Sequence, residues 1–478
     1  MLNNKGRPAE LVLDPEPQFE LSPYLYMQFM EPLGTTDGSV EAAWDFPRAC
    51  WREDFIAAAR ELVPTMLRWG GCFSSYYRWR EGVGPRCRRK PMDNLLWGGR
   101  ETNQVGTEEF VDCCRAVGAE PLLAVNFESD GRASWAHPVG GGIRRAGPAE
   151  AAAWVDYCNN TPAPRAVRFW QIGNETSYDP NGYDCETAAR RTRAFARAMR
   201  KADPTIKLIG WGDSGWAGRM LEVAGEELDY LAFHHHFDSG LPDSPLRGTE
   251  YRKAPELTWR HLLNAWKSSD ARLGEMRAAT GGKIALALTE SHFALPGRNR
   301  GEVLSTWAAG VANARILNTH ARHGDILKIA TLADFCGTRW MVNAIMIPTP
   351  PGQGRAYLMP VARVMALFRR HCGTKAVAVT TGPADLDITA SRRGKRFFLH
   401  VVNTSLAQAS AVKLEVRGMR IRSGKVFEIA AEPFAEIDET RPELFSPTAR
   451  ALPAGEEWSF PAASVSVVEV EVEEGRRI

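Results

Sequence analysis

The chain has 478 residues, of which 44% are hydrophobic, and its 59 lysines and arginines nearly balance 57 aspartates and glutamates, for a net charge of +2. This balance argues against nucleic acid or an anionic membrane as the main partner, and the sequence has no stretch of about 18 apolar residues that would span a membrane. The length exceeds one ordinary core and suffices for a large domain plus a smaller one.

The N-terminus and the cysteines bear on the cellular compartment. The first ten residues, MLNNKGRPAE, are polar and lack the apolar stretch of a signal peptide. The nine cysteines are an odd number and show no metal-ligand spacing, which favours a reduced setting over a disulfide framework. We therefore expect a cytoplasmic protein.

Strand-like apolar runs alternate with amphipathic stretches through most of the chain. The runs lie at 24–30, 65–70, 120–127, 166–175, 206–213, 228–237, 283–290 and 325–334. Helices are predicted at 51–63, 106–118 and 185–202. Apolar strands that alternate with helices are typical of a parallel sheet covered by helices, and eight such units predict an α/β fold of the closed (β/α)8 TIM barrel type over residues 20–360.

A doubly wound open sheet is the structural alternative. Such a sheet would carry a glycine-rich phosphate loop after its first strand, and the chain has Glu31-Pro32-Leu33-Gly34 there instead. Further along, the short basic cluster of Arg86, Arg88, Arg89 and Lys90 is interpreted as a solvated loop.

The pattern changes after about residue 361 to short alternating runs separated by turn residues. These runs lie at 375–381, 385–391, 395–403, 411–418, 424–431 and 463–474. They predict a C-terminal antiparallel β-sandwich over residues 361–478. An early run at 9–15 is expected to pair into this sandwich, so residues 1–19 are assigned to it as an N-terminal strand.

Two glutamates stand where barrel strands are expected to meet their loops. Glu175 ends the fourth run and Glu290 ends the seventh, and a barrel carries its chemistry at the C-terminal ends of its strands. Carboxylates on opposed strands can approach to about 5 Å, the separation used by glycosidases that retain configuration. One would act as acid and then base, and the other as nucleophile. Glu290 could instead be a buried glutamate paired with Arg68 or a histidine.

Other polar residues share these strand ends. They are Glu31, Arg68, Asn126, Asn174, Asp213, His234, His236 and Asp334. Such a polar ring either binds a ligand or forms a satisfied network, because unpaired buried charges are costly. Asn174 is expected to bind a sugar hydroxyl, and Arg68 either orients the nucleophile through a charge-assisted fork or forms a structural salt bridge.

The histidines and tryptophans extend this candidate site. His234 and His236 share one face of a strand, but no third ligand at suitable spacing is evident, so we expect hydrogen bonding near the carboxylates and no metal. Trp97 lies in the loop-like segment NLLWGGRETN. It is expected to face the substrate, since sugar rings stack on aromatic rings.

Longer motifs resemble those of the family 51 glycoside hydrolases, the α-L-arabinofuranosidases. The run MLRWGGCFSSYYRWREGVGP at 66–85 is similar to the Arg-x-Pro-Gly-Gly, Tyr-x-Trp, Asp-Gly-Ile-Gly-Pro stretch of that family. Similar stretches lie at 28–34, 101–127, 169–175, 329–335 and 459–472. The resemblance implies a clan A barrel with a β-sandwich, retention of configuration, Glu175 as acid/base and Glu290 as nucleophile.

The same resemblance assigns further residues and shows departures. Glu31, Cys72 and Asn174 match positions that line the terminal arabinose site, and Trp97 matches a tryptophan there. The departures from the family pattern are Thr289-Glu290-Ser291 for Asp-Glu-Trp, His236 for Tyr, Asp334 for Gln and Trp69 for Pro. They surround the terminal sugar and leave its identity open.

Three functions follow from these observations. The first is a retaining exo-glycosidase, an α-L-arabinofuranosidase that releases terminal arabinofuranose from oligosaccharides. It needs no cofactor, its partner is a carbohydrate, and assembly into a homo-oligomer stays open. The second is the same scaffold acting on a β-xyloside, a galactofuranoside or a glucan backbone. The third is an inactive sugar-binding protein, which the altered surroundings of Glu290 would explain.

Overall fold

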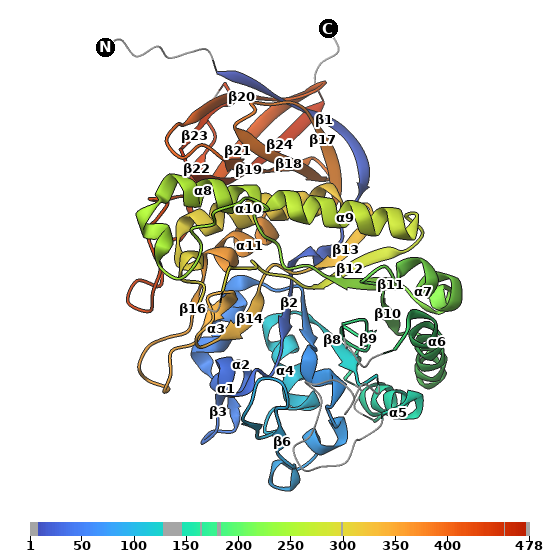
Figure 1. Ribbon diagram of the computed structural model, residues 1–478. Coiled ribbons are helices and arrows are strands. Elements are labelled where there is room, and N and C mark those ends of the chain that lie inside the picture. Colours follow the sequence, from blue (N-terminus) through green and yellow to red (C-terminus); the bar gives the residue numbers. More distant parts are fainter. Residues whose placement is uncertain are drawn as a thin grey trace.

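The computed structural model describes residues 8–127, 146–162, 165–178, 183–297, 300–453 and 455–474. A barrel clad in helices occupies one end of the molecule, and a curved sheet that includes the N-terminal strand caps the other end (Figure 1). Within the described residues, every helix is too short or too polar to cross a lipid bilayer.

The barrel has the predicted eight strands in chain order, each parallel to the next. They are β2 (Met27–Met30), β5 (Met66–Trp69), β8 (Glu120–Val125), β9 (Phe169–Ile172), β10 (Lys207–Trp211), β11 (Tyr230–His234), β12 (Ala285–Glu290) and β13 (Leu327–Ala330). The barrel prediction is therefore confirmed.

Strand eight is predicted from the sequence as one continuous run that ends at Asp334, and the structure differs from this prediction. The strand is split into β13, which pairs with β12, and β14 (Asp334–Gly337), which pairs with β2. The hydroxyl of Thr331 bonds to the backbone carbonyl of Ala333 at 3.0 Å, and such local bonds compete with the strand ladder. The two halves together close the barrel, and Asp334 starts the second half.

The apolar runs are continuous because both faces of the barrel strands are buried. Inward residues from every strand fill the interior, and these are Met27, Met66, Leu122, Phe169, Ile209, Trp211, Ala232, Ala287 and Ile329. The outward residues pack against the helices in a second, larger core.

The helices predicted from the sequence are present as α3 (Glu53–Leu62), α4 (Thr107–Val117) and α6 (Cys185–Ala202). The other long helices are α5 (Pro148–Asn159), α7 (Ala217–Ala224), α8 (Pro255–Asn264), α9 (Trp266–Thr280), α10 (Trp307–Arg322) and α11 (Pro360–Arg370). Helix α10 lies between the barrel strands and the curved sheet (Figure 1).

Shorter elements decorate the loops. They are α1 (Gly34–Asp37), α2 (Ser39–Ala42), β3 (Trp44–Asp45), β4 (Cys50–Trp51), β6 (Met92–Asp93), β7 (Arg100–Glu101), β15 (Asn343–Met346) and β16 (Tyr357–Leu358). The pairs β3–β4 and β6–β7 are two-stranded ribbons, and the second of these frames the loop that carries Trp97.

The C-terminal sheet has nine strands in the order β22-β21-β24-β19-β18-β17-β1-β20-β23. Their bounds are β1 (Ala9–Glu20), β17 (Lys375–Thr381), β18 (Leu386–Arg393), β19 (Arg396–Asn403), β20 (Ser410–Val416), β21 (Met419–Ala430), β22 (Thr448–Ala451), β23 (Glu457–Phe460) and β24 (Ser464–Glu474). Leu11, Phe397, Val426 and Phe460 share one apolar cluster. The sheet therefore folds over on itself as a sandwich.

One pairing corrects the prediction of a purely antiparallel sandwich. Strand β1 is antiparallel to β17 but parallel to β20. Strand β1 precedes the barrel in the chain and β20 follows it, so no hairpin turn fixes the direction of one relative to the other.

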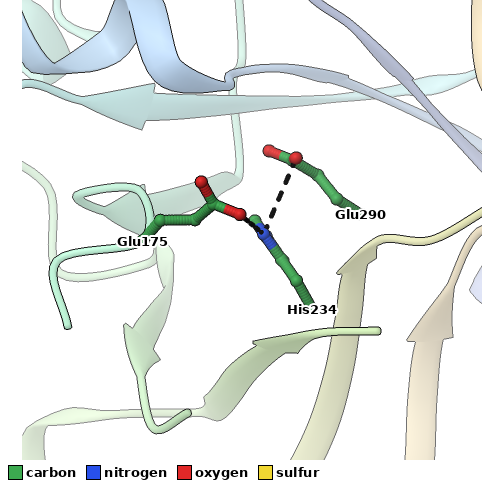
Figure 2. A group of neighbouring side chains, drawn as sticks. All are labelled: Glu175, His234 and Glu290. Carbon is green, nitrogen blue, oxygen red and sulfur yellow. Dashed lines mark hydrogen bonds and ion pairs between the residues drawn. The ribbon is translucent and has the colours of Figure 1, made fainter. Parts of the chain in front are cut away.

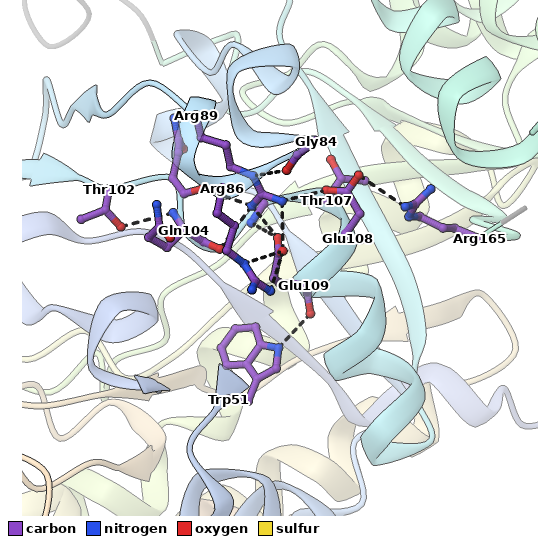
Figure 3. Close-up of polar contacts among 12 residues, drawn as sticks. Trp51, Gly84, Arg86, Arg89, Thr102, Gln104, Thr107, Glu108, Glu109 and Arg165 are labelled. Carbon is purple, nitrogen blue, oxygen red and sulfur yellow. Dashed lines mark hydrogen bonds and ion pairs between the residues drawn. The ribbon is translucent and has the colours of Figure 1, made fainter. Parts of the chain in front are cut away.

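The interpretation of the basic cluster as a solvated loop is wrong for Arg89. Its side chain is 2% exposed and donates to Glu109 at 2.7 Å, to Glu108 at 3.2 Å and to the carbonyl oxygens of Gly84, Asn103 and Gln104 (Figure 3). Both glutamates lie in the first turn of α4. Acidic side chains are favoured at a helix N-terminus. The first turn of α4 therefore supplies the negative charges that compensate the buried charge of Arg89.

We expect Arg89→Met to lower the free energy of unfolding by about 3 kcal/mol, because it leaves the buried Glu109 carboxylate without its closest cation. Urea denaturation would measure the loss. Arg88→Met, at an exposed neighbour, is the matched control and should change stability little. Equal effects of the two substitutions would contradict a structural role for Arg89.

Candidate functional site

The two glutamates singled out from the sequence meet at the C-terminal mouth of the barrel, with His234 between them (Figure 2). Glu290 ends β12 and His234 ends β11, and the two pair across the ladder just after a register shift between Phe233 and His234. One carboxylate oxygen of each glutamate and one ring nitrogen of His234 all lie within 4.8 Å of one another. The carboxylates are thus about as close as the sequence predicts.

Glu175 reaches this position through a tight turn after β9, which ends at Ile172 rather than at Glu175. Gly173 has φ 77° and Glu175 has φ 49°. A Cβ at Gly173 would lie 2.9 Å from the side chains of Phe127 and Thr176, so only glycine fits. Left-handed backbone at a residue other than glycine costs on the order of 1 kcal/mol and is characteristic of functional sites.

Arg68 on β5 ties the two carboxylate-bearing strands together. Its buried guanidinium donates to Glu290 Oε1 at 2.8 Å, to Asn174 Oδ1 at 2.5 Å and to Gln171 Oε1 at 2.9 Å. The salt bridge expected of Arg68 is therefore present, and it fixes the orientation of the Glu290 carboxylate.

His234 links the two glutamates. Its Nδ1 lies 2.8 Å from Glu175 Oε1 and 3.6 Å from Glu290 Oε2, and its Nε2 lies 3.0 Å from Thr289 Oγ1. Burial lowers the pKa of His234 to about 4, so the ring is neutral near neutral pH. A neutral ring has one N–H. When Glu175 is ionised, Nδ1 donates to it and the Thr289 hydroxyl donates to Nε2.

Glu175 has the titration behaviour expected of an acid/base group. Burial raises its pKa to about 7, an effect that Asp213 reinforces, while Arg68 and the Cys72 thiol oppose it. The thiol lies 3.8 Å from Glu175 Oε2. A carboxyl group that titrates near neutral pH can both give and take a proton there.

Two more carboxyl groups, Glu31 and Asp334, line the same mouth. Burial, and then the Glu290 charge, raise the pKa of Glu31 to about 8 and that of Asp334 well above its usual range. Trp97 Nε1 donates to Glu31 Oε1 at 3.1 Å. Asp334 Oδ1 is buried and has no hydrogen-bond partner among the described residues.

Gly71 explains why Glu31 can occupy this place. It has φ 144°, and a Cβ there would lie 2.3 Å from the Glu31 carboxyl carbon. The Gly70-Gly71 pair is therefore a sequence signal for the close approach of a side chain to the backbone.

The remaining predicted residues fall into two groups. Asn174, Cys72, Trp97 and Asn126 lie at this mouth, on or just after β9, β5, the β6–β7 loop and β8. Asn174 Nδ2 is buried without a partner among the described residues. His236 is exposed and packs on His292 with ring centroids 4.2 Å apart; no hydrogen bond within the described residues joins it to either glutamate.

Sequence reasoning missed three contributors. Gln171 holds Arg68 from inside β9, Thr289 holds His234, and Trp340 packs edge-on against Trp97 with centroids 5.6 Å apart. A polar residue within the apolar strand FWQI could have revealed Gln171, since buried polar groups need partners. Trp340 lies after β14 and has no such signal.

The oxygen, nitrogen and oxygen donors of Glu175, His234 and Glu290 are close enough together to hold a metal ion. The buried Arg68 guanidinium already occupies Glu290 Oε1, and its charge opposes a second cation there. A pair of carboxylates that differ in environment, one held by a cation and one with a pKa near neutrality, instead suits acid–base and nucleophilic chemistry.

Comparisons with known proteins show which domains this chain resembles. A family model described as "Alpha-L-arabinofuranosidase 1 domain" matches residues 58–240, and "Alpha-L-arabinofuranosidase C-terminal domain" matches 289–464. A solved structure, the α-L-arabinofuranosidase of Thermotoga maritima in complex with arabinose, is 25% identical with a TM-score of 0.78, over 97% of this chain and 100% of that one.

Curated relatives match over a shorter length. The probable α-L-arabinofuranosidase C of Aspergillus clavatus is 31% identical over 259 residues, which is 50% of this chain and 45% of the relative. The intracellular exo-α-(1→5)-L-arabinofuranosidase of Halalkalibacterium halodurans is 30% identical over 247 residues, 46% of each chain. The chain thus spans about half the length of the curated relatives it matches.

The raised pKa of Glu31 predicts a pH-dependent stability. The pKa of Glu31 rises from 4.5 to about 8 on folding, so between these two pH values the folded state binds more protons than the unfolded state. The free energy of unfolding therefore falls as the pH rises through this range. Glu31→Gln should flatten this slope and gain stability relative to the wild type at about pH 8. Urea denaturation at several pH values measures it.

The exposed Glu439 provides the control for this measurement. Glu439→Gln should keep the wild-type slope. A Glu31→Gln protein whose stability still falls as steeply with rising pH would contradict a protonated, buried Glu31.

Proposed function

We propose that this chain, which belongs to the α-L-arabinofuranosidases of glycoside hydrolase family 51, hydrolyses terminal arabinofuranosides with retention of configuration. The spacing of the two glutamates carries the proposal. Their nearest converging atoms lie within 4.8 Å, whereas inverting glycosidases keep their carboxyl groups roughly 6.5–9.5 Å apart to admit a water molecule.

In the first step, Glu290 attacks the anomeric carbon of the terminal sugar. Arg68 occupies Glu290 Oε1, so Oε2, which faces His234, is the attacking atom. Protonated Glu175 gives its proton to the oxygen of the leaving group as the bond to the sugar breaks. The products are a glycosyl ester on Glu290 and a neutral leaving group.

In the second step, Glu175 is a carboxylate and takes a proton from water, which attacks the same carbon and releases Glu290. Neutral His234 supports both states of Glu175. Its Nδ1 lies 2.8 Å from Glu175 Oε1, and it can donate to the carboxylate or accept from the carboxylic acid, with Thr289 adjusting at Nε2.

Unpaired groups at the mouth would bind the sugar hydroxyls. Asn174 Nδ2 and Asp334 Oδ1 lack partners among the described residues. Burial raises the pKa of Asp334 well above its usual range, and in its protonated form this carboxyl group offers one O–H donor and one carbonyl acceptor. A glutamine amide offers the same two functions, so this substitution can preserve the pattern that recognises arabinose.

The name of the Halalkalibacterium halodurans relative supports two extensions of the proposal, exo action and an intracellular location. All nine cysteines are free, which is compatible with a reducing compartment.

The roles of the two glutamates can be separated with a nitrophenyl arabinofuranoside. Glu290→Ala should lower turnover by more than about a thousand-fold, because no ester can form. Glu175→Ala should regain turnover with azide, which needs no base, and give the azide of retained configuration. Glu439→Ala is the matched control and should be fully active.

Proton NMR of the first sugar released, over a panel of nitrophenyl glycosides, tests stereochemistry and specificity together. Initial release of the inverted anomer, wild-type activity of Glu290→Ala, or hydrolysis of a xyloside or galactofuranoside but not the arabinofuranoside would contradict the proposal.

The pKa of Glu175 predicts the alkaline limb of activity. Because the protonated form is the acid, kcat/KM for an arabino-oligosaccharide should fall above about pH 7. A dinitrophenyl leaving group needs no proton, so the limb should flatten with that substrate. An unchanged limb with both substrates would assign it to another group.

A further inference from the structure

An aromatic ring stands exposed beside the acid/base residue. Tyr178 lies three residues after Glu175, and its backbone N–H donates to the Glu175 carbonyl oxygen at 2.8 Å. The residue is 46% exposed, and among the described residues only Phe46 and Leu444 are other large hydrophobic residues left in solvent.

The ring of Tyr178 is nevertheless held firmly. Its hydroxyl donates to Asp213 Oδ2 at 2.7 Å, and its ring meets Trp211 in a T-shaped contact with centroids 5.5 Å apart. Trp211 in turn meets His234 at 4.7 Å, and its indole N–H donates to Ser177 at 2.8 Å. An exposed side chain fixed in this way has already lost the rotamer freedom that binding would otherwise cost.

Asp213 is the anchor that connects this ring to the reacting groups. Its Oδ2 also accepts from the backbone N–H of His234 at 3.2 Å, and its Oδ1 accepts from Ser214 N–H at 2.6 Å and pairs with Arg272. Asp213 keeps these three partners if Tyr178 is removed. Loss of the ring should therefore leave the strand end and His234 in place.

From this arrangement we propose that Tyr178 is the platform on which the leaving-group sugar stacks, and that Asp213 positions it. The inference rests on the proposed function. Glu175 protonates the oxygen that joins the terminal sugar to the next one, so that next ring must lie on the side of Glu175 away from Glu290. The C–H face of a sugar packs on an aromatic ring. The substrate class is then an oligosaccharide with a second sugar ring beyond the scissile bond.

Two substrates separate this role from a structural one. An α-(1→5)-linked arabinobiose places a ring against Tyr178, whereas arabinofuranosyl fluoride has a leaving group without a ring. Tyr178→Ala should lower kcat/KM about ten-fold for the disaccharide and less than about two-fold for the fluoride. Tyr178→Phe keeps the ring but loses its bond to Asp213, and should fall between the wild type and Tyr178→Ala.

A second readout follows the glycosyl-enzyme. An added acceptor sugar should compete with water less well in Tyr178→Ala than in the wild type, so the ratio of transfer product to free arabinose should fall. Phe46→Ala, which removes an exposed ring elsewhere, is the matched control and should change none of these quantities.

Equal losses on the disaccharide and the fluoride would show that Tyr178 is only structural, and no loss on either would show that it binds nothing; both overturn the inference. A wild-type protein that does not hydrolyse the fluoride would overturn the proposed function itself, and the inference with it.

Discussion

One buried guanidinium, Arg68, sets the electrostatics of the barrel mouth. Glu31, Glu175, Glu290 and Asp334 face it or one another, and a single positive charge cannot stabilise four buried carboxylates. Arg68 bonds directly to Glu290. The other three carboxyl groups must therefore lower their negative charge by binding protons more tightly. The pKa values of Glu31, Glu175 and Asp334 are all raised, with burial as the largest cause in each. The mouth thus combines one carboxyl group held by a buried cation with three whose pKa values are raised, a difference in environment that suits a double displacement.

The barrel makes this arrangement from residues that are far apart in sequence. Strands two, four, six and seven deliver Arg68, Asn174 with Glu175, His234, and Glu290. Two glycines allow these side chains to reach their places. Gly173 permits the turn that points Glu175 inward, and Gly71 lets the Glu31 carboxyl group approach the backbone. Strand eight closes the barrel in two halves, and the second half places Asp334 beside β2. Fold and chemistry therefore share the same few backbone features.

The periodicity of apolar runs was enough to predict the eight strands and both glutamates, since buried parallel strands read as continuous apolar segments. It could not predict the parallel pairing of β1 with β20 or the burial of Arg89, because each depends on partners distant in sequence. Apolar periodicity is also blind to the break in strand eight, where the Thr331 hydroxyl bonds locally to the Ala333 carbonyl. The shared strand face of His234 and His236 suggested a shared role, yet β11 ends at His234 and His236 packs on His292 instead. Thr289, noted only as a departure from the family pattern, is the hydrogen-bond partner of His234.

In the proposed mechanism, Glu290, held by Arg68, forms a covalent bond to the sugar. The most direct measurement is peptide mass spectrometry of the protein after reaction with 2-deoxy-2-fluoroarabinofuranosyl fluoride, a substrate that forms the ester faster than it hydrolyses it. We expect a single added fluoroarabinosyl group on the peptide that contains Glu290, and none in Glu290→Ala. A label on Glu175 or Glu31, or no label on a protein that hydrolyses the parent fluoride, would contradict it.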